Sequence, residues 1–143
     1  MDTMYLLVLF AVGQLTSNLI KPCPDSPNCV STTHDPADAT HYIAPIGYSQ
    51  DEAEVLLIIK DIVNNMPRSL IVKEDAFYLH AEFRSRIFRF VDDVEFYLDT
   101  VNKRIHFRSA ARLGYGDFGV NRRRMEEISR KIEGRLNNSE AGQ

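Results

Sequence analysis

The hydrophobic pattern changes its period at Pro67, and this change constrains the fold more than any other feature of the chain. After Pro67, apolar and polar residues alternate in four short runs, within residues 70–72, 77–83, 88–98 and 105–107. Alternation places every second side chain on the same face of a strand. Four such runs joined by short polar links predict a four-stranded antiparallel meander with one buried face.

Residues on either side of the meander follow helical spacing. Ser49 and Glu52 match a capping box, in which each side chain bonds the other residue's backbone amide, and a helix is predicted from there to about Asn65. Residues 122–136 return to helical spacing, with Asn121 as the predicted N-cap. The two helices are expected to cover the apolar face of the sheet. The predicted fold is α+β, in the order α-β-β-β-β-α.

Opposite charges on the polar face of the meander favour particular registers between neighbouring strands. A tight link at residues 85–86 would place Glu82 opposite Arg89, and the following hairpin would place Glu95 opposite Arg108. Such cross-strand pairs stabilise a sheet, whereas like charges destabilise it. This polar face is expected either to be solvated or to bind a ligand or a partner.

The beginning of the chain differs in composition from the rest. Residues 4–15 form an almost unbroken apolar run, which is short for a membrane span and typical of the central region of a signal peptide. We expect residues 1–20 to be either a signal peptide or a membrane anchor. A signal peptide would be cleaved after Gly13 and would direct the protein to the periplasm or the extracellular space. Residues 21–136 are predicted to form a single α+β domain, and residues 137–143 a disordered tail.

The two cysteines, Cys23 and Cys29, lie close together in a proline-rich segment. In an exported chain, two cysteines most simply form one disulfide bond. The alternative is a metal site, because His34 and His41 follow in the spacing C-x5-C-x4-H-x6-H. This spacing matches no common zinc pattern. The disulfide is therefore the favoured prediction, and no metal or cofactor is expected.

Charge is distributed unevenly along the chain. Residues 84–135 hold thirteen Lys and Arg against eight Asp and Glu, whereas acids predominate in residues 1–83. Either the two halves neutralise each other within one fold, or the basic segment forms an anion-binding face. Nucleic acid is not the expected partner, because no lysine-rich stripe is present.

Asp92 and Asp93 are the candidate catalytic carboxylates. Asp92 falls on the apolar side of its predicted strand, where a carboxylate needs a partner or a shifted pKa. Three interpretations remain open: a bulge that lets both aspartates reach solvent, a buried pair with Arg112 or an arginine of residues 122–124, and a catalytic acid or base.

The loop Gly114–Gly119 spells G-x-G-x-x-G, but it follows an antiparallel strand rather than opening a βαβ unit, so it does not predict dinucleotide binding. Its amides, Arg112 and the following helix N-terminus could together hold an anion, and Tyr115 could add a hydroxyl group.

Arg122, Arg123 and Arg124 lie in a first helical turn, where cations oppose the helix dipole. Carboxylates of Asp117, Asp92 or Asp93, or a bound anion, would compensate them. A structural lock made of arginines and aspartates is favoured over an anion site, because the chain supplies enough carboxylates.

Two ordered motifs occur in the chain: C-P-x-S-P-N-C at Cys23–Cys29, and R-S-x-x-R-x-G-x-x-D-x-G-x-N-R-x-R beginning at Arg108. With these motifs, residues 21–135 resemble the DUF1499 family of bacterial and plastid proteins, a domain of unknown function. The resemblance implies an exported or membrane-associated protein and supplies no catalytic residues. The signature residues by motif position are Arg108, Ser109, Arg112, Gly114, Asp117, Gly119, Asn121, Arg122 and Arg124.

The leading functional hypothesis is a non-enzymatic binding or structural module, with a small anion or an envelope protein as its partner. One alternative is a hydrolase-like or isomerase-like enzyme that uses Asp92 or Asp93 as a base and Arg112 and Arg124 to bind an anionic substrate. Another is an envelope component that docks onto a partner through the charged face of the sheet.

Overall fold

The computed structural model describes residues 20–142. The predicted signal-like segment and its cleavage after Gly13 lie outside these residues. Within the described part of the chain, no helix is long and apolar enough to cross a membrane.

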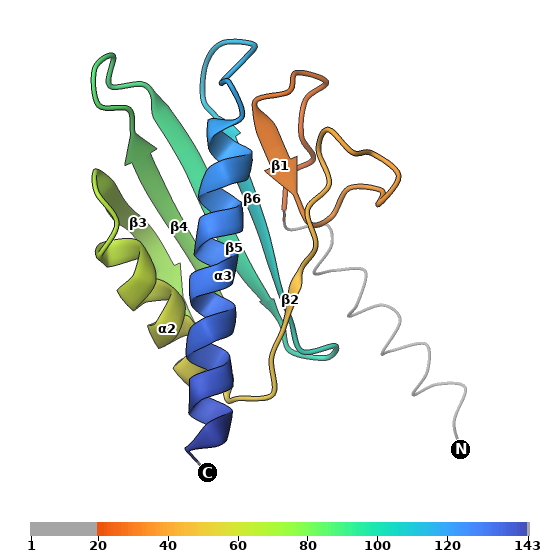
Figure 1. Ribbon diagram of the computed structural model, residues 1–143, viewed down its shortest axis with the longest axis vertical. Helices are drawn as coiled ribbons and strands as arrows, with labels where there is room; N and C mark the ends of the chain where they lie inside the picture. The colour runs from red at the N-terminus through yellow and green to blue at the C-terminus, as the bar shows by residue number, and fades with distance from the viewer. Residues whose placement is uncertain (1–19, 143) are drawn as a thin grey trace.

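Within residues 20–142, one antiparallel sheet of six strands forms the centre of the fold, and two helices lie across one of its faces (Figure 1). The strand order is β1-β6-β5-β4-β3, and β2 also pairs with β6. The elements are β1 (Cys29–Ser31), β2 (Ile46–Gly47), α2 (Glu52–Asn64), β3 (Ser69–Asp75), β4 (Tyr78–Arg84), β5 (Val91–Asp99), β6 (Arg104–Ala111) and α3 (Val120–Ala141).

The predicted α+β class and the β3-β4-β5-β6 meander are confirmed, but the predicted number of four strands is wrong. The additional strands, β1 and β2, have three and two residues. Runs of this length are too short to display an alternating pattern, so the sequence carried no periodic signal for them.

The β5–β6 register is as predicted, with Glu95 opposite Arg108. The predicted β4–β5 register is wrong, because Glu82 lies opposite Asp93 rather than Arg89. Residues 85–90 form a wide loop instead of a tight link, and its ends are joined by the Ser85 amide, which donates to the Phe90 carbonyl at 2.9 Å. The four residues 86–89 therefore bulge out of the sheet, and β5 begins only at Val91.

The core lies between the helices and the sheet, as the alternating pattern predicts. The rings of Phe96 and Phe107, which face each other across β5 and β6, are fully buried with their centroids 6.2 Å apart. Helix α2 contributes Val55, Ile59 and Val63, and α3 contributes Met125, Ile128 and Ile132. Burial of these apolar side chains is the main source of stability for such a two-layer arrangement.

Both helices begin differently from the prediction. The capping box at Ser49 does not form; the N-cap of α2 is Asp51, and the Ser49 hydroxyl instead donates to Glu140 of α3 at 2.6 Å. The N-cap of α3 is Gly119, in the left-handed region with φ of 75°, so Asn121 lies inside the helix. Helix α3 also continues to Ala141, through most of the segment predicted to be disordered.

The two edges of the sheet are irregular. On one edge, β1 and β2 pair with successive parts of β6, and residues 32–45 leave the edge between them and return. The other edge is β3, whose register with β4 shifts between Ile71 and Lys73. Both edge strands are therefore interrupted.

Candidate functional site

The two sequence motifs meet at one end of the sheet, although they are far apart in the chain. This end, which we call the motif end, carries the loops of residues 24–28, 85–90 and 112–119 (Figure 1). The Asn28 side-chain amide donates to the Gly114 carbonyl at 2.8 Å. The Asn28 carbonyl in turn accepts the Ala111 amide at 3.0 Å and the Asn121 side-chain amide at 3.2 Å. Asn28 therefore joins the first motif to the second.

Arg124 is the centre of a buried polar cluster beneath these loops. Its Nη2 lies 2.7 Å from Oδ2 of Asp92, and the two side chains are only 12% and 14% exposed. Its Nη1 donates to Asn121 Oδ1 at 2.9 Å and lies 3.3 Å from the Ser109 hydroxyl, which itself donates to Asn121 Oδ1 at 2.6 Å. The guanidinium also lies 4.8 Å from the centre of the Phe83 ring. The cluster ties α3 to β4, β5 and β6.

Asp92 remains in regular strand pairing, so a bulge does not expose it. It lies opposite Phe83 on β4 and Ala111 on β6, on the face of the sheet that the helices cover. Its break in the alternating pattern is accommodated by Arg124, which reaches it from α3. Of the three interpretations of Asp92, the buried pair with an arginine of residues 122–124 is the one that matches the geometry.

Asp117 caps the first turn of α3. Its Oδ1 accepts the Gly119 amide at 2.9 Å, and its Oδ2 accepts the backbone amide and the side-chain amide of Asn121 at 3.0 and 2.7 Å. Burial raises the pKa of Asp117, but these hydrogen bonds outweigh it and hold the pKa below its usual value. The positive φ of Phe118 and Gly119 turns the chain so that the carboxylate reaches back to these amides.

This carboxylate therefore occupies the place at the helix N-terminus where an anion would bind. The sequence predicts that Asp117 compensates the arginines of the first turn, but the residues that it binds are Gly119 and Asn121.

Arg122 binds carbonyl groups where a carboxylate partner was expected. Its Nη2 donates to the carbonyl oxygens of Ala39, Thr40 and Tyr42 at 3.2, 3.0 and 2.9 Å. A guanidinium suits this position because its several N–H donors lie in one plane. Arg122 thereby fixes the loop of residues 32–45 to α3.

Arg112 lies on the opposite, polar face of the sheet. It binds Asp93 with two hydrogen bonds, of 3.0 and 2.7 Å, and approaches Glu82 at 3.3 Å. His80 Nε2 lies 2.9 Å from the same Asp93 carboxylate. Burial raises the pKa of Asp93, but Arg112 and His80 outweigh it and lower the pKa. Arg112 is thus separated from Arg124 by the sheet, so the arginines and aspartates of the predicted lock form two separate groups rather than one.

Arg108 belongs to the same polar face, opposite Glu95. Burial lowers the pKa of its guanidinium, and the nearby carboxylates of Glu95 and Asp93 oppose this shift. Within the described residues, its Nε has no hydrogen-bond partner. The polar face is therefore a half-buried charged network rather than a fully solvated surface.

A family model described as "Protein of unknown function (DUF1499)" matches residues 19–132. The chain belongs to the DUF1499 family. A search of curated proteins finds no match. The matched region of this DUF1499 domain contains both motifs and therefore the whole of the buried cluster around Arg124.

The motif end of the DUF1499 domain also displays a group of exposed apolar side chains that the sequence pattern did not reveal. Phe118 is 97% exposed, and Phe88 is 74% exposed with its ring stacked on that of Phe90 at 5.6 Å. The others at this end are Ile87, Leu113 and Tyr115. Phe88 and Phe90 continue the alternation of apolar and polar residues that is typical of a strand with one buried face. The sequence pattern therefore predicts that they lie in the core.

A pocket of about 380 Å³ lies between the loops 85–90 and 112–119. Phe88, Phe90 and Phe118 line it, together with other residues of the two loops. Asp92 and Asp117 are among its polar lining residues, and both make the internal hydrogen bonds described above. Chemically, the pocket offers an apolar surface with its carboxylates already engaged.

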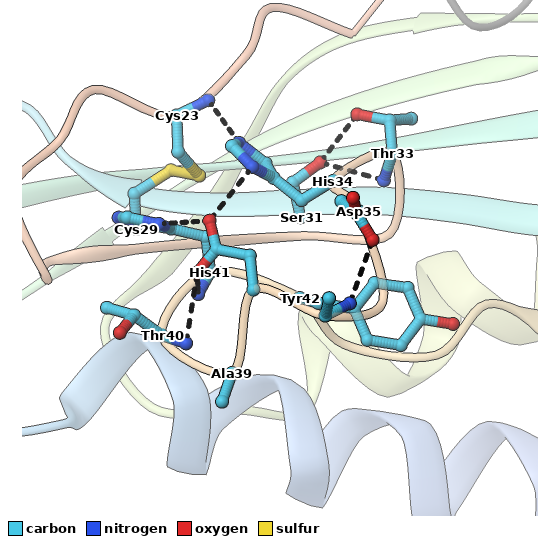
Figure 2. A network of polar contacts seen from close by, with 12 residues as sticks. Cys23, Cys29, Ser31, Thr33, His34, Asp35, Ala39, Thr40, His41 and Tyr42 are labelled. Atoms are coloured by element: carbon cyan, nitrogen blue, oxygen red, sulfur yellow. Dashed lines mark hydrogen bonds and ion pairs between the residues drawn. A yellow bond between two sulfur atoms is a disulfide. The ribbon is translucent and has the colours of Figure 1, made fainter.

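The predicted disulfide between Cys23 and Cys29 is confirmed, with its Cα atoms 5.7 Å apart (Figure 2). Because both sulfur atoms are in this bond, they are not available as metal ligands. His34 and His41, the other two residues of the alternative metal pattern, nevertheless lie close together beside the disulfide, with their ring centroids 5.2 Å apart.

Proposed function

We propose that this DUF1499 protein is a non-enzymatic binding module, exported or held at a membrane by its N-terminal segment, and that its motif end docks onto an anionic membrane surface. The observation that carries the proposal is the concentration of exposed apolar side chains on two adjacent loops, surrounded by arginines. Phe and Leu side chains insert into the boundary between lipid headgroups and acyl chains, and the hydroxyl group of Tyr115 can stay among the headgroups.

The charges around the apolar loops are complementary to anionic lipid. Arg86, Arg89 and Arg123 are exposed at this end and make no ion pair within the described residues, whereas the exposed Arg84 and Arg112 face the carboxylates of Glu82 and Asp93. Each basic residue near an anionic membrane surface contributes about 1 kcal/mol of attraction. The exposed apolar side chains of the loops and the arginines around them therefore act together, because neither alone would attach the protein stably to a membrane.

The motif residues act in this proposal as a frame for the loops. Asp117 and Gly114 hold the loop 112–119 through their contacts with Asn121 and Asn28. Arg124 joins the same end of α3 to β5, directly after the loop 85–90. A frame of this kind keeps the apolar side chains exposed at fixed positions, which reduces the entropy lost when they bind.

The enzymatic alternative has weaker support because both candidate bases are engaged. Asp92 faces the guanidinium of Arg124, and Asp93 faces that of Arg112 in a two-bond contact with a lowered pKa. A carboxylate with a lowered pKa, such as that of Asp93, is a poor proton acceptor at neutral pH, and the carboxylate of Asp92 is already occupied by Arg124. Docking to an envelope protein through the same end is the alternative that the experiment below distinguishes.

Vesicle co-sedimentation of the full chain tests the proposal. Binding to vesicles of phosphatidylglycerol should exceed binding to vesicles of phosphatidylcholine and should weaken with salt. Phe118→Ser should lower the partition coefficient about tenfold, and Arg86→Gln with Arg89→Gln about tenfold or more. Leu57→Ser, on the exposed side of α2, is the matched apolar control.

The N-terminal segment is the same in all variants, so differences between them report the motif end alone. Equal binding by wild type, Phe118→Ser and Leu57→Ser would show that this end does not contact lipid. Binding to an envelope protein but not to vesicles would replace the lipid surface by a protein partner.

A further inference from the structure

The loop of residues 32–45, which interrupts the edge strand of the sheet, is held firmly on two sides. The Ser31 amide donates to the His41 carbonyl at 2.7 Å, and Arg122 binds three carbonyl groups between residues 39 and 42. The disulfide of Cys23 and Cys29 closes the preceding segment. Side chains of this loop are therefore presented on a rigid support.

Three side chains of the loop converge on one point. Asp38 Oδ2 lies 2.8 Å from Nδ1 of His41 and 3.4 Å from Nδ1 of His34. One ligand atom from each of the three residues lies within 4.8 Å of the other two. The histidines are largely covered and Asp38 is partly open to solvent. The point where the three side chains converge is therefore open to water on the side of Asp38.

The hydrogen bonds of His41 determine which of its nitrogens faces the carboxylate. Its Nε2 lies 3.0 Å from the Ser26 carbonyl, which can only accept, so Nε2 carries a proton. Nδ1 of the same ring lies 2.8 Å from the carboxylate oxygen of Asp38, and the lone pairs of both atoms point at the cation, a proton or a metal ion, that lies between them. Two acceptors at this separation repel each other unless they share a cation.

We propose that His34, Asp38 and His41 form a binding site for a divalent transition-metal ion of the zinc class. A histidine that ligates a metal ordinarily donates its second N–H to a carbonyl or carboxylate, as His41 does to Ser26. Imidazole nitrogens and a carboxylate oxygen are the ligands of open, water-containing zinc sites.

Two of the three separations between ligand atoms need only small adjustment, and the third, between the two histidines, is at most 4.8 Å. Ligands about 2.0–2.1 Å from a tetrahedral zinc ion lie roughly 3.4 Å from one another. The contact of His34 with Asp38 already has this length, and that of His41 with Asp38 must open by about half an ångström. Asp38 can move in this way because its side chain is the most exposed of the three.

His34 is the weaker of the two histidine ligands, because the Cys23 amide already donates to its Nε2 at 3.0 Å (Figure 2). Ligation through Nδ1 moves the ring proton to Nε2, and ligation through Nε2 replaces the amide directly. Either route gives up the contact with Cys23. Removal of His34 should therefore weaken the site less than removal of His41.

Titration of the full-length, disulfide-bonded chain with zinc chloride tests the site, with binding followed by calorimetry. We expect one Zn²⁺ per chain, a loss of affinity of at least a hundredfold in His41→Ala and Asp38→Asn, and a smaller loss in His34→Ala. His80→Ala is the matched control, because His80 also contacts a carboxylate, Asp93 at 2.9 Å, at a distant place in the sheet. It should bind Zn²⁺ as the wild type does.

Nitrogen chemical shifts of the histidine rings provide a second measurement on the wild-type protein, independent of whether a variant folds. Zinc should change the ring signals of His34 and His41 and leave those of His80 unchanged. Failure to bind Zn²⁺ at 100-fold molar excess would overturn the proposal, since the shared cation would then be a proton. Binding that survives both His41→Ala and Asp38→Asn would overturn it as well.

Discussion

Arg124→Ala should lower the free energy of unfolding by about 3–5 kcal/mol, because it leaves the buried carboxylate of Asp92 without its partner. The molecule offers a matched comparison. Arg135 contacts Asp61 at the same 2.7 Å, but those side chains are 48% and 54% exposed, against 12% and 14% for Arg124 and Asp92. An exposed pair contributes only about 0–1 kcal/mol, since water solvates either charge alone. The two ion pairs have the same length and differ in burial, and this difference is why we predict a large loss of stability for Arg124→Ala and a small one for Arg135→Ala.

Urea unfolding of wild type, Arg124→Ala and Arg135→Ala at neutral pH gives the two differences directly. Arg124→Ala also loses hydrogen bonds to Asn121 and Ser109, so its cost should exceed that of Arg135→Ala by about 2 kcal/mol or more. Adding Asp92→Ala to Arg124→Ala removes the unpaired charge. The double variant should therefore be less destabilised than the two single losses added together.

Equal stability of Arg124→Ala and Arg135→Ala would refute the reasoning. An Arg124→Ala protein of wild-type stability that had lost phosphate or sulfate binding would show instead that the arginines form an anion site.

Two further changes test other parts of the structure. The lowered pKa of Asp117 means that its contribution to stability is complete above the ordinary carboxyl pKa and is lost as the pH falls through the folded-state value. Asp117→Asn should therefore be less stable than wild type at neutral pH and approach it as the pH falls through the lowered pKa of Asp117. A constant difference in urea melts across the acid range would contradict this. Phe96→Ala, in the core, should cost about 3–5 kcal/mol and Tyr97→Ala, on the polar face, much less; equal costs in the same melts would contradict a sheet with one fully buried face.

The period of the apolar residues predicted most of the fold because burial acts on one face of each element. The β5–β6 register was predicted correctly because the same register places apolar residues opposite each other on one face and opposite charges together on the other. The β4–β5 link failed because the exposed Phe88 and Phe90 continue the alternation of the strand. Side chains exposed at a loop cannot be told from core residues by their polarity alone.

The sequence identified the residues of the candidate site better than it identified the partners that each of them contacts. Asp92 was singled out because it interrupts an apolar face, and the arginine that reaches it comes from the expected segment. Asp117 was assigned by charge, yet its partners are amides made available by the left-handed backbone at Phe118 and Gly119. Asp38 was missed because it contacts histidines three and four residues away only after the loop has folded.

The irregular edges of the sheet bear on whether copies of this protein can pair through their edge strands. An uninterrupted edge strand presents a row of free amides and carbonyls that can pair with another chain. Here the register shift at Ile71 and Lys73, followed by the charged Glu74 and Asp75, breaks one such row, and two very short strands make up the other edge. A molecule with apolar loops at one end thus gains protection against growth into extended β-aggregates.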